Sequence, residues 1–144
     1  MGVALNLARE AATVGEVPVG AVVVVAGEVV GSAYNQTVGS HDPTGHAEIR
    51  ALREAGRTLA NYRLPGATLY VTIEPCTMCA GALVHARVGE LVFGAREPRS
   101  GAVMSTASVL DNAGLNHRVV ITEGVLATEC ALVITDFFAA KRSV

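Results

Sequence analysis

The segment Thr72-Ile73-Glu74-Pro75-Cys76-Thr77-Met78-Cys79-Ala80 joins two patterns that predict different secondary structures. Residues 67–73 are rich in β-branched and aromatic side chains, which is typical of a buried strand. Residues 78–84 have the composition of a helix. The sequence therefore predicts that Cys76 and Cys79 open a helix directly where a strand ends.

This placement favours metal binding by the two cysteines. Residues three apart lie on one face of a helix, so the thiols of Cys76 and Cys79 converge. The unpaired N–H groups and the positive dipole at a helix N-terminus lower a thiol pKa and favour the thiolate, which is the form that binds metal. Two converging thiolates supply half of a tetrahedral zinc site.

The other half of the predicted site lies upstream, in His46 and Glu48. The Asp-Pro pair at 42–43 is typical of an N-cap followed by the first helical position, which predicts a helix over about 43–57. One imidazole and two thiolates leave a fourth position open for water, as a catalytic zinc requires, and Glu48 is then a proton shuttle. Because residues two apart on a helix point about 200° apart, His46 and Glu48 can share a site only if it straddles the helix end.

Each half of the pattern has a simpler interpretation when it stands alone. A lone Cys-x-x-Cys that opens a helix can be a redox-active dithiol, and a lone His-x-Glu is common. The two halves together form the pattern H-x-E…P-C-x-x-C, which is that of zinc deaminases and predicts a cytidine-deaminase-like fold.

Composition limits the class of protein. The 144 residues predict a single domain over 1–144, and the 4% aromatic content predicts an aliphatic core. A net charge of −2 is not that of a typical nucleic-acid-binding chain. Three cysteines argue against a disulfide framework, and Arg9 and Glu10 lie where a signal peptide needs an apolar run. Since no apolar run approaches the length of a membrane span, we expect a cytoplasmic protein with no membrane partner.

The hydrophobic pattern predicts an α/β fold with the element order α-β-β-α-β-α-β-(α)-β-α. The expected strands are 17–25, 28–34, 67–73, 90–94 and 118–122, and the other expected helices are 3–14, 104–110 and 125–142. These elements predict a three-layer α/β/α sandwich with a five-stranded mixed sheet, in which an antiparallel hairpin precedes parallel strands. Cys130 lies on the apolar stripe of the last helix, and we expect it to be a core residue.

Several segments outside the motifs carry a closer resemblance. They are residues 17–22, 42–48, 61–64, 69–76, 93–96, 116–118 and 136–138. Together they resemble the bacterial tRNA-specific adenosine deaminases over nearly the whole chain. The resemblance implies a homodimer that converts the wobble adenosine of an arginine tRNA to inosine.

The resemblance also implies roles for individual residues. His46, Cys76 and Cys79 would bind one zinc ion, and Glu48 would transfer protons. Asn35 would help to hold the target nucleotide. The anticodon loop would be contacted from two segments, by Arg96, Glu97 and Arg99 and by Phe138, Lys141 and Arg142. Two positions depart from the family pattern: Glu97 replaces the usual Asp beside the nucleotide, and Gly45 replaces the usual Ala.

Three alternatives stay open at this point. A free-base or nucleoside deaminase, acting for example on guanine or cytosine, would use the same zinc centre. A thiol–disulfide redox protein would use Cys76 and Cys79 without His46. A non-catalytic RNA-binding module with a structural zinc would need a fourth protein ligand, and none is evident near either motif.

Overall fold

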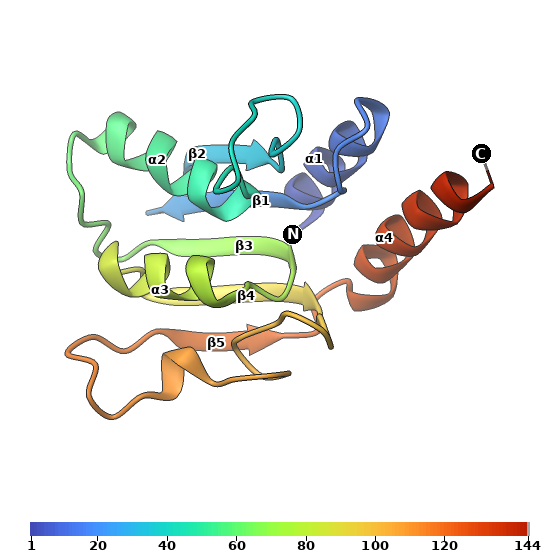
Figure 1. Cartoon of the computed structure of the whole chain (residues 1–144). Helices are drawn as coiled ribbons and strands as arrows, with labels where there is room; N and C mark the ends of the chain where they lie inside the picture. Colours follow the sequence, from blue (N-terminus) through green and yellow to red (C-terminus); the bar gives the residue numbers. More distant parts are fainter. Residues whose placement is uncertain (144) are drawn as a thin grey trace.

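The structure is a computed structural model that describes residues 1–143 (Figure 1). Among these residues the elements are α1 (Gly2–Thr13), β1 (Gly20–Val25), β2 (Glu28–Tyr34), α2 (Ala47–Leu59), β3 (Thr68–Ile73), α3 (Thr77–His85), β4 (Glu90–Ala95), the 3-10 turn η1 (Val109–Asp111), β5 (Val120–Glu123) and α4 (Ala127–Arg142). The five predicted strands and the four main helices are confirmed.

The five strands form one mixed sheet in the order β2-β1-β3-β4-β5. β1 is antiparallel to both β2 and β3, whereas β4 is parallel to β3 and β5. Because β1 runs against β3, the start of β1 and the end of β2 lie at the same end of the sheet as the C-termini of β3 and β4. Loops from all four strands therefore meet at this end.

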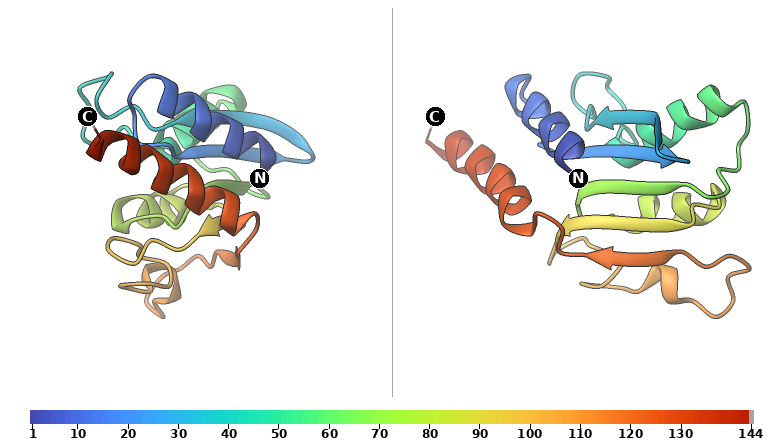
Figure 2. Two further views of the ribbon diagram at one scale, coloured as in Figure 1. Left: turned by 90° about the vertical axis from the view of Figure 1, so that its right-hand side faces the viewer. Right: turned by 180° about the vertical axis from the view of Figure 1, so that it is seen from behind.

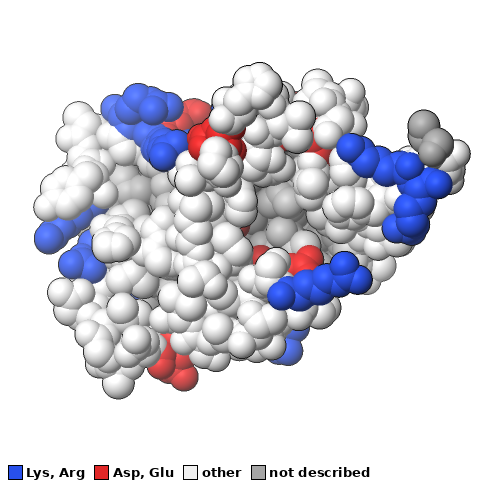
Figure 3. All heavy atoms as spheres, in the orientation of Figure 1, with Lys and Arg blue, Asp and Glu red and all other residues white. Residues whose placement is uncertain are grey.

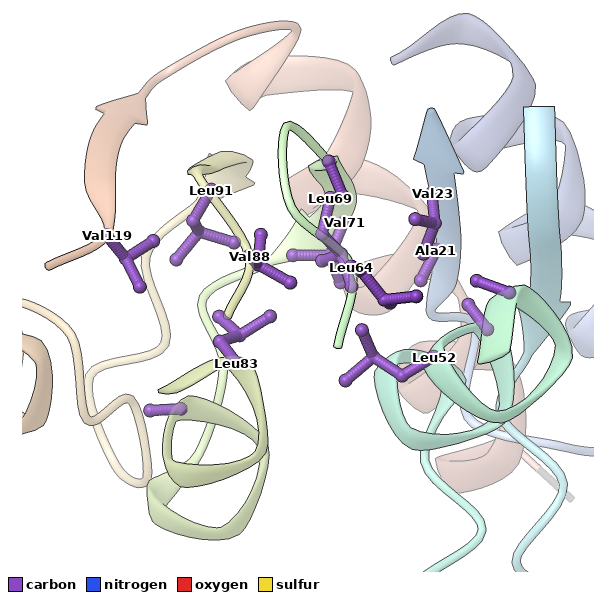
Figure 4. Packing of buried hydrophobic residues seen from close by; sticks show 14 of the residues in the cluster. Ala21, Val23, Leu52, Leu64, Leu69, Val71, Leu83, Val88, Leu91 and Val119 are labelled. Carbon is purple, nitrogen blue, oxygen red and sulfur yellow. The ribbon is translucent and has the colours of Figure 1, made fainter. Parts of the chain in front are cut away.

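Helices cover both faces of the sheet, which confirms the predicted three-layer sandwich. α2 and α3 lie on one face, and α1 and α4 lie on the other (Figures 1 and 2). The core between the sheet and helices α2 and α3 is largely aliphatic. Its buried members include Leu69, Val71, Leu83 and Leu91 (Figure 4).

Small residues let α2 approach the sheet closely. Ala51 and Ala55 of α2 are fully buried, and they face Gly31 of β2. A Cβ atom on Gly31 would overlap the Ala51 carbonyl oxygen and would lie 2.8 Å from the Ala55 nitrogen. Glycine is therefore required here by the distance between the two backbones.

The predicted start of the second helix was wrong. α2 begins at Ala47 rather than at residue 43, and Asp42 is not its N-cap. Asp42 Oδ1 instead accepts hydrogen bonds from the Thr44 N–H at 2.9 Å and the Thr44 hydroxyl at 2.7 Å. This local turn competes with helix formation. His46 takes the N-cap position with an extended backbone (φ −69°, ψ 150°).

The helix expected over 104–110 was also wrong, since only η1 forms there. The N–H groups of Met104 and Ser105 donate to the distant Glu74 carboxylate instead of to helix carbonyls. Cys130 is buried against the sheet, as predicted. Within the described residues, no helix combines the length and apolar character needed to cross a membrane.

Candidate metal and active site

Two helix N-termini bring one histidine and two cysteines together. His46 is the N-cap of α2, Cys76 is the N-cap of α3, and Cys79 lies in the first turn of α3. The His46 Nδ1 atom is 3.7 Å from the Cys76 sulfur and 3.5 Å from the Cys79 sulfur. All three donor atoms lie within 4.8 Å of one another, so the three residues can bind one ion.

The distances between these atoms fit zinc. With Zn–S near 2.3 Å and Zn–N near 2.0–2.1 Å, a tetrahedral zinc places a sulfur and a nitrogen ligand about 3.6 Å apart. The observed separations of 3.7 Å and 3.5 Å agree with this value. Three protein ligands leave one tetrahedral position open, which is the arrangement of catalytic rather than structural zinc.

The donor atoms also have the electrostatic properties of a metal site. Hydrogen bonds with Cys79 and His46 lower the pKa of the Cys76 thiol to about 3. The hydrogen bond to Cys76 raises the pKa of His46, and the hydrogen bond to Cys76 together with burial raises the pKa of Cys79. The three groups therefore share protons around a stabilised thiolate, and a divalent cation can displace those protons.

Glu48 lies beside this cluster. It is on the first turn of α2, its side chain is only 3% exposed, and it lines the same pocket as His46 and Cys76. His46 and Glu48 can face the same pocket because His46 precedes the regular helix and Glu48 lies in its first turn. This is the arrangement across the helix end that the sequence analysis required. Burial raises the pKa of the Glu48 carboxyl, so this group can hold a proton closer to neutral pH than an exposed glutamate can.

The pocket above the cluster has a volume of about 300 Å³, at the small end of the range for ligand sites. Asn35, which is buried, and Glu97 contribute polar groups to its wall, and Phe138 contributes an apolar one. These three residues, predicted from separate segments, are brought together with the metal cluster. The other lining residues are Val17, Val19, Thr37, Ile73, Glu74, Ser100 and Ile134.

The predicted basic residues have different surroundings. Arg99 and Arg142 line a second hollow of about 450 Å³, which adjoins the pocket through Glu97 and Phe138. Figure 3 shows Lys and Arg side chains toward the C-terminal end of α4, on a face that is hollowed near its middle. Arg96 makes two hydrogen bonds to the Glu123 carboxylate, at 3.0 Å and 3.1 Å.

Lys141 has a partner of its own. Its Nζ atom lies over the ring of Phe137, 5.0 Å from the ring centroid. This cation–π contact keeps the charge on α4 without neutralising it. Of the four predicted cations, Arg96 alone is paired with a carboxylate within the described residues.

No role was predicted from the sequence for two buried glutamates near the pocket. Glu16 and Glu74 are each only 2% exposed. Glu74 lies within the Glu-Pro-Cys motif, but the motif was interpreted through its cysteines alone. An acidic residue at the end of an apolar strand was the available signal for Glu74, whereas no local pattern marks Glu16.

Comparison with known proteins identifies the family. The family model described as MafB19-like deaminase matches residues 1–142. The tRNA-specific adenosine deaminase of Haemophilus influenzae is 48% identical over 143 residues, which cover 99% of this chain and 83% of that protein. The chain belongs to the tRNA-specific adenosine deaminase family. The resemblance stated from the sequence is thereby confirmed.

Solved structures give the same result for the fold. A structure from a study of A-to-I editing by tRNA:A34 deaminases at the wobble position of transfer RNA matches with a TM-score of 0.90 and 43% identity, over 92% of this chain and 96% of that one. The guanine deaminase of Nitrosomonas europaea matches with a TM-score of 0.83 and 25% identity, over 96% of this chain and 82% of that one. The predicted cytidine-deaminase-like α/β fold is confirmed, and the chain is an enzyme of the deaminase family.

Proposed function

We propose that this chain is a zinc-dependent hydrolase that converts adenosine to inosine at the wobble position of a tRNA anticodon. The observation that carries the proposal is the His46–Cys76–Cys79 cluster on the wall of a pocket that also contains the buried Glu48. The relative from H. influenzae and the tRNA:A34 deaminase structure support the choice of substrate.

In this proposal His46, Cys76 and Cys79 would hold one zinc ion beside the pocket that His46 and Cys76 line. When bound there, zinc would supply hydroxide near neutral pH for the hydrolysis, because it would lower the pKa of water. The cluster supports this role because its donor separations match tetrahedral zinc. The redox alternative has less support, since both thiols lie next to the His46 imidazole, which a redox-active dithiol would not need.

Glu48 transfers the protons. Hydrolysis of adenosine consumes one water and releases ammonia, so a proton must leave the water and others must reach the ring nitrogen and the departing amine. A carboxyl with a raised pKa can accept the first proton and deliver it in the same cavity. Burial keeps bulk water away from Glu48 during this transfer.

The pocket holds one base, and the surrounding residues hold the RNA. A volume of about 300 Å³ admits a single nucleotide and not a duplex. Unpaired anticodon bases can be extruded into such a pocket at little cost. Asn35 and Glu97 hold the target nucleotide from opposite walls, and Phe138 gives an aromatic face against which a base can stack.

Arg99 and Arg142 are the main phosphate contacts in this proposal, because both line the hollow next to the pocket. Lys141 adds its charge from the end of α4. Arg96 can meet a phosphate only in competition with Glu123. A local basic surface of this kind can bind RNA even though the chain has a net charge of −2.

Three further features are proposed from the family resemblance. They are an arginine tRNA as the substrate, a cytoplasmic location and a homodimer. A wide, mainly apolar hollow of about 920 Å³ between α2 and α3 offers a surface for a second copy. Tyr62, which is 77% exposed, lies on this hollow.

The test is to incubate the purified protein with an anticodon stem-loop that carries adenosine at the wobble position and to measure inosine. A stem-loop with guanosine at that position is the matched control, and free adenosine and free guanine are tested in parallel. We expect inosine from the first substrate alone. Efficient turnover of free guanine without inosine in the stem-loop would instead support the small-molecule alternative, which the match to a guanine deaminase favours.

A further inference from the structure

Two buried carboxylates lie beside the active site but are neither metal donors nor the proposed proton shuttle. Glu16 and Glu74 are each only 2% exposed. Burying a charge is costly unless hydrogen bonds compensate it. In both residues the compensating donors come from loops that form the walls of the substrate pocket.

Glu74, at the end of β3, accepts hydrogen bonds from one long loop. Its Oε2 atom accepts from the N–H groups of Val103 at 3.1 Å, Met104 at 2.7 Å and Ser105 at 2.9 Å. Its Oε1 atom accepts from the Glu97 N–H at 3.0 Å and from the Ser105 hydroxyl. Five donors occupy the two oxygens, so this carboxylate acts on the loop rather than on the substrate.

The loop also passes unusually close to Glu74. A Cβ atom on Gly101 would overlap all three atoms of the Glu74 carboxyl group. Glycine at 101 is therefore needed to admit the carboxylate. The same loop carries Glu97 and Ser100, both of which line the pocket. Glu74 thus contributes five hydrogen bonds to the position of this wall, beside that from the Ala102 N–H to the Pro75 carbonyl.

Glu16, between α1 and β1, accepts hydrogen bonds from the loop on the opposite side of the pocket in the same way. Its carboxylate accepts hydrogen bonds from the N–H groups of Val38 at 3.1 Å and Gly39 at 2.6 Å. These amides belong to the loop that follows β2, which contributes Asn35 and Thr37 to the pocket. Each wall loop is therefore tied to the scaffold by one buried carboxylate.

We propose that Glu16 and Glu74 are positioning residues that fix the two loops of the substrate pocket and thereby set substrate affinity. The identity of the substrate in this inference rests on the proposed function. The anchoring of the loops does not, because it follows from the hydrogen bonds alone.

The first test measures hydrogen exchange at the loop amides in native protein and in Glu74→Ala, Glu74→Gln and Glu16→Ala. We expect Glu74→Ala to speed exchange at residues 97 and 103–105 by about tenfold or more, because charge-assisted hydrogen bonds are removed. Glu74→Gln keeps one carbonyl oxygen for the three amides of 103–105, so exchange should rise mainly at residue 97. Glu16→Ala should affect residues 38 and 39, and zinc content should stay at the native value in all variants.

The second test separates positioning from general stability. On the anticodon stem-loop we expect Glu74→Ala to raise KM about tenfold while kcat stays within about twofold, with Glu74→Gln in between. Gly101→Ala should raise KM by a similar factor, because it displaces the carboxylate. When added to Glu74→Ala, the Gly101→Ala change should have little further effect, since no carboxylate is left to displace.

Different results separate the two proposals. If native protein fails to deaminate the stem-loop, the proposed function is wrong, but the exchange measurement still decides the anchoring. If native protein is active and the variants show native KM and native exchange at these amides, the positioning role is wrong. Should Glu74→Ala fail to fold, Glu74→Gln and Gly101→Ala decide the question by the same two measurements.

Discussion

Glu48 is buried among groups that can exchange protons, and its replacement by an isosteric amide isolates the chemical step. Glu48→Gln keeps the size of the side chain but cannot carry a proton, so we expect kcat to fall by roughly 10²–10⁴-fold. Zinc content should be unchanged because Glu48 is not among the donor atoms. Glu54→Gln, at an exposed position of the same helix, is the matched control and should have native kcat. Near-native turnover by Glu48→Gln would remove Glu48 from the mechanism.

Glu74 gives a prediction for stability as a function of pH. Burial alone would raise its pKa, but hydrogen bonds led by that from Ser105 lower the pKa from 4.5 to about 2. A carboxyl whose pKa is lower in the folded protein stabilises it above the unfolded pKa, and this stabilisation is lost as the pH falls through the folded pKa. The free energy of unfolding of native protein should therefore fall more steeply than that of Glu74→Gln between about pH 5 and pH 2.

Urea unfolding at several pH values measures this difference. One pKa unit corresponds to about 1.4 kcal/mol, so the gap between native protein and Glu74→Gln should shrink by at most about 3 kcal/mol over the range. Both proteins have the same proposed metal donors, so loss of a bound zinc ion in acid would affect them equally and would cancel in the comparison. Parallel curves for the two proteins would show that the Glu74 pKa is not lowered.

At the scale of the elements, the contact between α2 and β2 depends on the absence of a side chain at residue 31. Gly31→Ala places a methyl group against the Ala51 carbonyl, so we expect the free energy of unfolding to drop by about 1–3 kcal/mol or more. Gly81→Ala is the matched control, because its Cβ atom meets nothing within 4 Å and the residue lies inside α3. Alanine there should stabilise by up to about 1 kcal/mol. Equal effects of the two changes would contradict the close contact.

The elements that were predicted correctly are those determined by local pattern. The strands and helices follow from hydrophobic periodicity, and the clustering of His46, Cys76 and Cys79 follows from two short motifs at helix starts. A wrong prediction arises where a side chain far away in the sequence determines the local backbone structure. The Glu74 carboxylate accepts hydrogen bonds from the N–H groups of Met104 and Ser105, and these groups therefore do not form the helix expected over 104–110. Asp42 is a local exception, since its side chain forms a turn with Thr44 where an N-cap was expected.

At the scale of the whole molecule, the proposed binding of RNA by a chain with net charge −2 must depend on where its cations lie. Arg99 and Arg142 line the hollow beside the pocket, and Lys141 extends the same end of α4. Arg118, which is exposed near Asp111, precedes β5 at the opposite end of the sheet and is the matched control. Removing a cation from the proposed RNA-binding surface should change the salt dependence of binding, whereas removing Arg118 should not.

We therefore expect each of three variants, Arg99→Ala, Arg142→Ala and Lys141→Ala, to reduce the slope of log affinity against log salt. The slope should fall by about 0.7 for every phosphate of single-stranded RNA that the variant no longer neutralises. Binding should weaken more at low salt than at high salt, while turnover of bound stem-loop stays near native, because none of these residues touches the zinc donors. Arg118→Ala should keep the native slope. The measurement is stem-loop binding over a salt series, together with kcat/KM on the stem-loop and on free adenosine. Efficient turnover of the nucleoside, combined with native slopes in all three variants, would contradict an RNA substrate, because a small substrate without a phosphate chain gives these cations nothing to bind.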